Sequence, residues 1–284
     1  NAAIAELATG DVDTAVKIQA IVNQVNTDIA TENAIAKIDT YADDQTNTPT
    51  TADYATAAVD DVTNENIDRI NAAIAELATG DADTAVKIQV IVNQVNTDIA
   101  TENAIGKIDT YADDQTNTPT TADYSTGGVD DVTNENLDRV NAAIALLNTG
   151  DVDTAVKIQV IVNQVNADIA TEDAITKIDT YADDQTIVPT TTDYSVAGVD
   201  DVTNENLDRV NAAIAELATG DVDTAVKIQV IVNQVNADIA TENAISKIDT
   251  YADDQAVVPT TIDYATAGVD DVTSENLDRV NAAI

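Results

Sequence analysis

The sequence lacks His, Cys, Met, Trp and Phe altogether. Without His or Cys the chain cannot supply Ser/His/Asp or Cys/His nucleophilic sites, the usual ligands of zinc, haem and iron–sulfur clusters, or a disulfide. Any metal that it binds must therefore be held by oxygen ligands, as calcium is.

Basic residues are scarce as well. The chain has 12 Lys and Arg against 52 Asp and Glu, so its net charge is −40. Such a chain is repelled by phosphates, which excludes nucleic acid as a partner. No apolar run approaches the roughly 18 residues of a membrane helix, so we expect no membrane insertion by this segment. With no signal peptide and no initial Met, we expect an excerpt of a longer protein.

What the sequence does have is a repeat with a period of 70 residues. Four copies occupy residues 1–70, 71–140, 141–210 and 211–280, and residues 281–284 begin a fifth. The structural boundaries are expected here or shifted toward the glycine of each copy, namely Gly10, Gly80, Gly150 and Gly220. Hydrophobic residues make up 44% of the chain, which is enough to bury a core in each copy. The sequence therefore predicts a tandem array of independently packed units.

Helical spacing of apolar residues predicts an all-α fold. In the fourth copy Leu207, Val210, Ile214 and Leu217 follow Thr203 as N-cap, and Gly220 is the expected C-cap. A second helix is expected after Asp221 or Asp223, with one apolar stripe made of Ile228, Ile231, Val232, Val235 and Ile239. A strand over residues 227–232 is the alternative, because Val230, Ile231 and Val232 are β-branched.

A third apolar stripe follows without an intervening Gly or Pro. At 100° per residue, Ile245 and Ile248 fall on a different side from Ile228 and its partners, so one continuous helix would need two cores. We therefore predict a break around residues 236–241, with Thr241 as a new N-cap. A short helix is expected at residues 262–267, closed by Gly268. Four such helical bundles would form an elongated rod or a string of beads.

Paired aspartates are the candidate metal ligands. The run that begins at Asp221 departs from an EF-hand, because Val226 replaces the required Gly and Val232 replaces the final Glu. Helix capping explains most of these carboxylates, and calcium bound at a junction between repeats is the alternative. The calcium candidates, with their equivalents in other repeats, are Asp221, Asp223, Asp253, Asp254, Asp270 and Asp271.

No cofactor and no catalytic residue is expected. Carboxylate pairs serve glycosidases, but four near-identical copies with two aromatic residues each make four sugar clefts a poor explanation. We expect Tyr251 and Tyr264 to pack against apolar neighbours with their hydroxyls in water, and carbohydrate stacking is the alternative. Lys227, Lys247 and Arg279 are expected to form ion pairs on helix surfaces.

The runs KIDTYADDQ, PTTIDYATAGVDDVTSENLDRVNAAI and GDVDTAVKIQVIVNQVN resemble the helical tandem repeats of very large bacterial surface and adhesin-type proteins, often from marine bacteria. The resemblance covers the whole chain. It implies an extracellular extender at the bacterial cell surface that projects a terminal binding domain. It transfers no functional residues, because the matching positions are core and cap positions.

Two functions are compatible with the repeat, the acidity and the resemblance. The first is a structural spacer whose partners are the neighbouring repeats of the same chain. The second is a repeated module that binds calcium, a glycan or a partner protein through avidity. Drift of Thr46, Asn47 and Thr48 to Ala256, Val257 and Val258 favours the spacer, and we do not expect an enzyme.

Overall fold

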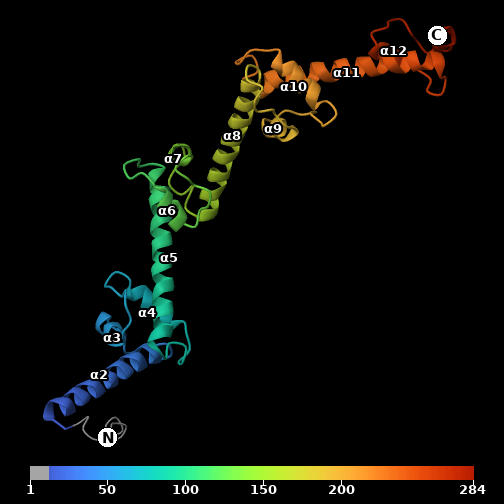
Figure 1. Ribbon diagram of the computed structural model, residues 1–284. Helices are drawn as coiled ribbons and strands as arrows, with labels where there is room; N and C mark the ends of the chain where they lie inside the picture. The colour runs from blue at the N-terminus through green and yellow to red at the C-terminus, as the bar shows by residue number, and fades with distance from the viewer. Residues whose placement is uncertain (1–12) are drawn as a thin grey trace. The chain divides into compact units, whose positions relative to one another are not determined.

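The computed structural model describes residues 13–284, and within this range all regular structure is α-helical (Figure 1). The chain divides into two compact units, Asn1–Val162 and Asn163–Ile284. The predicted all-α repeat fold is confirmed, whereas the first predicted helix of copy 1 and Gly10 lie outside the described residues. The helices are α2 (Ala15–Thr40), α3 (Thr51–Thr56), α4 (Ile67–Ala75), α5 (Ala85–Tyr111), α6 (Thr121–Thr126), α7 (Leu137–Ile144), α8 (Ala155–Tyr181), α9 (Thr191–Val196), α10 (Leu207–Ala215), α11 (Ala225–Asp253), α12 (Thr261–Thr266) and α13 (Leu277–Ala283).

The long helices begin where the sequence predicts a helix start. In α11 the N-cap is Thr224, whose side chain accepts a hydrogen bond from the backbone N–H of Lys227. The strand alternative at residues 227–232 is wrong, because these residues lie in the first turns of α11. Within residues 13–284, no helix combines the length and the apolar character that crossing a membrane requires.

The predicted break at residues 236–241 is also wrong. α11 runs through this stretch, and Thr241 lies inside the helix, where its hydroxyl donates to the backbone oxygen of Thr266 at 3.2 Å. Polar side chains here bond along the helix instead of interrupting it, as when Gln234 donates to Asp238 at 2.8 Å. The change of side of the apolar stripe is real, and its physical explanation is that one helix serves two cores.

Unit Asn1–Val162 shows this sharing most clearly. The N-terminal half of α5 contacts α4, and its C-terminal half contacts α6 and α7 (Figure 1). Ile88 and Val92 are fully buried in the first half, and Ile108 is fully buried in the second. A stripe that turns to another face halfway along the helix is thus covered by different neighbours on each half.

One complete core joins the end of α2, all of α3 and α4, and the start of α5. Its buried residues come from both the first and the second copy of the repeat. The predicted domain boundaries therefore describe where the sequence repeats, and they stay a prediction. They are Ala34, Ile38, Tyr54, Ala57, Val59, Ile70, Ile74, Ala82, Ile88, Val92 and Val95. An equivalent core in unit Asn163–Ile284 runs from Ala174 to Val235.

The short helix is confirmed within one residue of its predicted ends. Thr260 and Asp263 form a capping box at the start of α12, and Gly268 follows its end with a φ of +76°. In the first copy the position of this glycine is taken by Ala58, which keeps a positive φ of 58°. An alanine in this left-handed conformation is strained.

The helix that contains Leu207 differs from its prediction at both ends. It begins at Leu207, because the Asn206 side chain accepts from the Thr203 N–H at 2.7 Å and donates to the Asp201 oxygen at 2.7 Å. These bonds hold residues 203–206 in a turn, so Thr203 is not the N-cap. The helix ends at Ala215, and Gly220 adopts its positive φ of 98° in the following turn and not as the C-cap.

Candidate functional site

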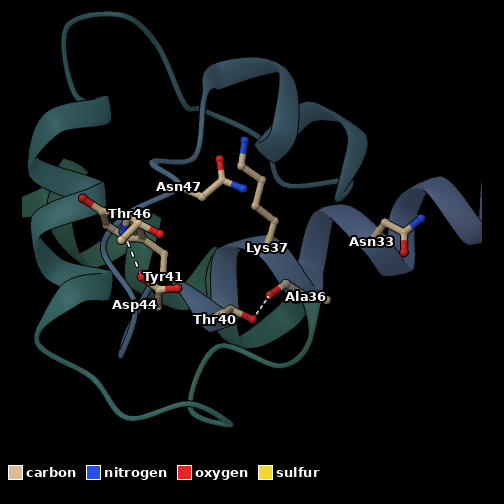
Figure 2. Close-up of a pocket in the computed structure, with 8 residues that line it drawn as sticks. All are labelled: Asn33, Ala36, Lys37, Thr40, Tyr41, Asp44, Thr46 and Asn47. Atoms are coloured by element: carbon tan, nitrogen blue, oxygen red, sulfur yellow. Dashed lines mark hydrogen bonds between the residues drawn. The ribbon is translucent and has the colours of Figure 1, made fainter.

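A pocket of about 410 Å³ lies beside the last turns of α2 (Figure 2). α2 contributes Lys37 and Thr40, and the loop after it contributes Asp44 and Asn47. In Figure 2 the Lys37 side chain rises from the helix toward the loop that carries Asn47. The complete lining is Asn33, Ala36, Lys37, Thr40, Tyr41, Asp44, Thr46 and Asn47.

An ion pair fixes one side of this pocket. The Lys37 Nζ atom donates to the Asp53 Oδ2 atom at 2.7 Å, and the same oxygen accepts from the backbone N–H of Thr50 at 2.7 Å. Burial raises the pKa of Asp53, but the hydrogen bonds from Lys37 and Thr50 outweigh it and hold that pKa below its ordinary value of 3.8. The amine in the pocket wall is therefore already neutralised by a carboxylate that caps α3.

The rest of the wall is shaped by the loop and by Tyr41. The Asp44 Oδ1 atom accepts from the backbone N–H of Thr46 at 3.2 Å, which turns the loop back toward the helix (Figure 2). Tyr41 is half-buried and lines the same space. The pocket thus offers a phenol ring, hydroxyls, amides and carboxylates, a set suited to hydrogen bonding with a neutral polar ligand.

The pocket recurs at the same place in the next two copies. Its volume is about 500 Å³ beside Tyr111 and about 280 Å³ beside Tyr181. Part of the lining changes from copy to copy, because Ala36 is replaced by Gly106 and Thr176, and Asn47, which is kept as Asn117, is replaced by Ile187. The other lining residues of the first pocket keep their type in all three copies except Asn33, which becomes Asp173.

Comparison with known proteins finds no protein-family model, no curated protein and no solved structure that matches the chain. The function of the chain must therefore be inferred from its own geometry.

The six predicted calcium candidates lie in turns and at helix ends, and three of them make a bond there. Asp221 accepts from the Ala218 N–H at 3.1 Å, Asp223 pairs with Lys227 at 2.7 Å, and Asp254 accepts from the Ala256 N–H at 3.1 Å. Asp253 ends α11, Asp270 lies in the loop after α12, and Asp271 has a positive φ of 63°. Over residues 13–284 the structure brings no three acidic side chains together in a group fit for a metal ion. Calcium binding stays a prediction from sequence alone.

An unpredicted carboxylate connects distant parts of the chain. Asp39 is 9% exposed, and its Oδ1 atom accepts from the backbone N–H groups of Gly80 at 2.8 Å and Ala82 at 3.0 Å. In the second copy Asp109 accepts from Gly150 at 2.7 Å. The signal in the sequence is an Asp one helical turn after Ile35, on the apolar face of the helix, where a carboxylate requires partners.

The two tyrosines of each copy have different environments. The expectation that the Tyr264 hydroxyl reaches water is wrong, because Tyr264 is 2% exposed and its hydroxyl donates to Asn281 at 2.6 Å. Tyr54 likewise is fully buried and donates to Asn71 at 2.7 Å, and Asn71 donates to the Pro49 oxygen at 2.9 Å. Only the Tyr41 series is placed where a ligand could touch it.

Lys227 and Lys247 pair as expected, whereas Arg279 makes no ion pair within residues 13–284. Lys227 pairs with Asp223 within four residues, whereas Lys247 reaches Asp263 across to α12 at 2.6 Å. Arg209 makes two bonds to Glu242, at 2.5 and 2.8 Å, and so joins α10 to α11. The lysine of the Lys247 series therefore connects two helices in all four copies, and the arginine does so at Arg69 and Arg209.

Proposed function

We propose that the chain is a structural extender of a large bacterial cell-surface protein, one that projects a terminal binding domain from the cell. The observation that carries this proposal is the continuity of α5, a 27-residue helix whose two halves are buried in successive cores. An uninterrupted helix holds its two ends at a set distance, about 40 Å for this length. Neighbouring bundles are then joined without a flexible linker.

The distribution of constant and varied positions supports the same proposal. The buried hydrogen-bonded pairs that hold each bundle together recur from copy to copy, as Tyr54 with Asn71 and Tyr194 with Asn211 do. Some positions that line the pocket vary, as Asn47 and Ile187 show, although Lys37 and Tyr41 keep their type in the three pockets. A spacer requires these buried pairs and tolerates changes at exposed positions, because its stability is a sum over the folded units and their interfaces.

The acidity of the chain supports an extracellular location in this proposal. Each copy carries 13 acidic and 3 basic residues, so it has a charge of 3 − 13 = −10. At seawater-like ionic strength the Debye length falls to about 4 Å, which screens the repulsion between neighbouring bundles. The same charge keeps an exposed surface soluble and apart from its neighbours.

The proposal is tested by changing the number of copies. Removal of residues 71–140, or of 71–210, leaves the repeat pattern in register, and small-angle scattering then measures the maximum dimension of chains with two, three and four copies. We expect a constant increment per copy, up to the roughly 40 Å length of one long helix, with and without calcium. A dimension that does not grow with copy number would refute a spacer, and growth only in calcium would require metal-stiffened junctions.

The recurring pocket favours a second candidate, a repeated module that binds a glycan. A half-buried Tyr beside amides and hydroxyls suits a sugar face, and repetition would raise avidity. Glycan binding by the four-copy chain, lost on replacing Tyr41, Tyr111 and Tyr181 by Ala and kept when exposed Thr97 is replaced by Ala, would establish it. Absence of binding across a broad glycan panel would refute the glycan-binding module and leave the spacer as the remaining proposal.

A further inference from the structure

The first half of α5 carries two valines that are exposed to solvent. Val86 is 75% exposed and Val90, one helical turn later, is 63% exposed. Valine is a poor residue for an exposed helical position, because its branched side chain loses rotamer freedom there. Single exposed apolar residues need no explanation, but this pair lies on one line of a helix whose opposite face is already packed against α4. The two valines therefore form an apolar stripe without a partner.

The same pair recurs in the two later long helices. Val156 and Val160 are 75% and 61% exposed in α8, and Val226 and Val230 are 75% and 60% exposed in α11. α5 contacts a bundle with each of its halves, so its valines stay exposed although the packing around this helix is complete. The exposure is thus a property of the repeat itself.

The valines belong to a longer line of exposed side chains. Val86, Val90, Asn93 and Thr97 follow one another at intervals of four, three and four residues, and all four are exposed. Helices that pair in a coiled coil use this spacing along their seam. We call this set the valine stripe of α5, and it is about 18 Å long. Its counterparts are Val156, Val160, Asn163 and Ala167 in α8, and Val226, Val230, Asn233 and Ala237 in α11.

The valine stripe is almost free of charge in a strongly acidic chain. Residues 85–97 contain no Asp or Glu and one basic residue, Lys87. The Lys87 Nζ atom is already held by the Asp83 carboxylate at 2.8 Å and by the Gly80 carbonyl oxygen at 2.9 Å. An acidic partner would thus find no free cation here, and a basic partner would find no carboxylate within the stripe. The surface suits a partner with apolar and amide side chains.

A second copy of the chain presents such a surface in its own valine stripe. Two chains with a net charge of −40 repel each other over most of their surfaces. The acid-free stripe is the place where this repulsion is weakest, and there valines and amides of one copy would meet valines and amides of the other. The helix is already folded, so docking requires no ordering of the backbone.

The bundle on the second half of α5 decides how a second copy could lie. Ala104 follows Val86 by 18 residues, or about five turns, so both lie on the same line of the helix. Ala104 is buried where α6 packs against α5, and the Thr101 hydroxyl beside it donates to the Thr126 oxygen at 3.1 Å (Figure 1). α6 therefore lies on the same side of α5 as the valine stripe. Two parallel stripes would bring both copies of α6 between the helices at one level, where they would collide, whereas antiparallel stripes place each α6 beyond the start of the other helix.

We propose that the valine stripe binds the same stripe of a second copy of the chain, with the two helices antiparallel. Val86 of one copy then faces Thr97 of the other, and Val90 faces Asn93. The contact is two-fold symmetric and uses the same residues on both chains. One short stripe is less than the roughly 1,200 Å² that a stable interface buries, so a single contact is weak, and the stripes of α8 and α11 add to it by multivalency. This inference does not depend on the spacer or the glycan proposal.

Sedimentation velocity of the 284-residue chain at increasing concentration, in 0.5 M NaCl to screen the repulsion between chains, tests the proposal. We expect reversible dimers and larger species in the unmodified chain. The combined variant V90D, V160D and V230D places a carboxylate in the middle of each stripe. It should weaken self-association by at least about tenfold, because the contact would bury unpaired like charges.

The matched control is the combined variant N33D, N103D and N243D. It adds the same charge at exposed positions in the second halves of α2, α5 and α11, where the third copy already has Asp173. This control should associate like the unmodified chain, and circular dichroism checks that the helices of both variants are intact. A chain that is monomeric at every concentration, or equal weakening by the two variants, would overturn the proposal.

Flotation with phosphatidylcholine vesicles examines a lipid surface as the occupant of the stripe. The stripe is narrower than the apolar face by which an amphipathic helix binds a membrane, so we expect no binding. Binding by the unmodified chain that is lost in the variant with three new carboxylates on the stripes would assign the stripe to lipid and overturn the proposal.

Disulfide cross-linking tests the orientation, because the chain has no cysteine of its own. Chains that carry V86C and chains that carry T97C are mixed in equal amounts under mild oxidation. The antiparallel contact brings these two positions opposite each other, within the short reach of a disulfide, so the mixed dimer should be the main product. N103C, at an exposed position outside the stripe, measures cross-linking by random collision. A yield no higher than that of N103C, or an excess of homodimers of the V86C chain, would overturn the proposal.

Discussion

Asp39 and Gly80 are joined by a hydrogen bond of 2.8 Å, although 41 residues separate them in the chain. The carboxylate stands near the end of α2, and the N–H group belongs to the loop that leads into α5. The same Oδ1 atom also accepts from Ala82. One carboxylate thus holds the end of one long helix to the entry of the next and closes the bundle between them.

Loss of this carboxylate should destabilise the first complete bundle. D39A leaves two backbone N–H groups without their partner, which we expect to cost about 1 to 3 kcal/mol. D39N keeps an oxygen acceptor and should cost less. Urea unfolding followed by circular dichroism measures the difference, and D28A is the charge-matched control because Asp28 is exposed and bonds only along its own helix. Equal effects of D39A and D28A would contradict a structural role for the bond.

The buried tyrosine should behave similarly. Y54F removes the hydroxyl that donates to Asn71 and leaves the Asn71 oxygen buried without this donor. We expect a loss of about 1 to 2 kcal/mol in the free energy of unfolding. Y41F, at the half-buried tyrosine of the same copy, should change stability by much less, and a reversal of this order would show that the Tyr54 hydroxyl is dispensable.

Ala58 offers a stabilising substitution. It keeps a φ of 58°, where Gly128, Gly198 and Gly268 stand in the other copies with φ values of 74°, 73° and 76°. A58G should relieve the left-handed strain of a side chain and stabilise the first bundle by about 1 kcal/mol. G128A is the reverse experiment and should destabilise the second bundle by a similar amount. An A58G chain that unfolds at lower urea would count against this explanation.

Acid stability should depend on the capping aspartates. Hydrogen bonds from Lys247 and Thr260 lower the pKa of Asp263 from 3.8 to about 2. The folded-state pKa lies below the unfolded value, so this stabilisation is present above pH 4 and is lost as the pH falls toward 2. Unfolding measured between pH 2 and 5 should therefore show a steeper loss of stability in the unmodified chain than in D263N. Parallel curves would mean that Asp263 does not contribute.

The continuity of the long helix can be tested at its centre. Ala100 is exposed in the middle of α5, between the halves that enter different cores. A100P should cost about 3 kcal/mol and separate the unfolding of the two bundles, whereas A100G should cost about 1 kcal/mol and leave them coupled. Hydrogen exchange along α5 distinguishes the two outcomes. Unaltered protection in A100P would favour the break that sequence alone predicts.

The sequence is sufficient to predict the all-α class and the starts of α11 and α12, because these depend on local signals. α11 begins just after Asp223, α12 begins within one residue of its predicted start, and the stripe of Ile228 and Val232 is buried as predicted. Local signals could not decide whether the helix breaks near Thr241. A stripe that changes side indicates either two helices around one core or one helix in two cores, and only the neighbours that cover each half decide between them.

The pocket and the Asp39 bonds were beyond sequence reasoning for a related reason. Asp39 meets Gly80 only because α2 and the loop before α5 converge on one core. Sequence reasoning singled out the adjacent pairs of aspartates as candidate ligands. The buried carboxylate, Asp39, is not part of such a pair. Its position on the apolar face next to Ile38 was the available sign.

The burial of the two halves of α5 in different cores has a consequence for how such a chain changes in length. The cores from Ala34 to Val95 and from Ala174 to Val235 are each closed by a helix of the adjoining copy, so the segment that folds as a unit is shifted along the sequence from the segment that repeats. Unequal recombination that inserts or deletes 70 residues, wherever the crossover falls, therefore restores an intact bundle on both sides of the join. The number of copies can therefore change by whole repeats without disturbing the bundles on either side.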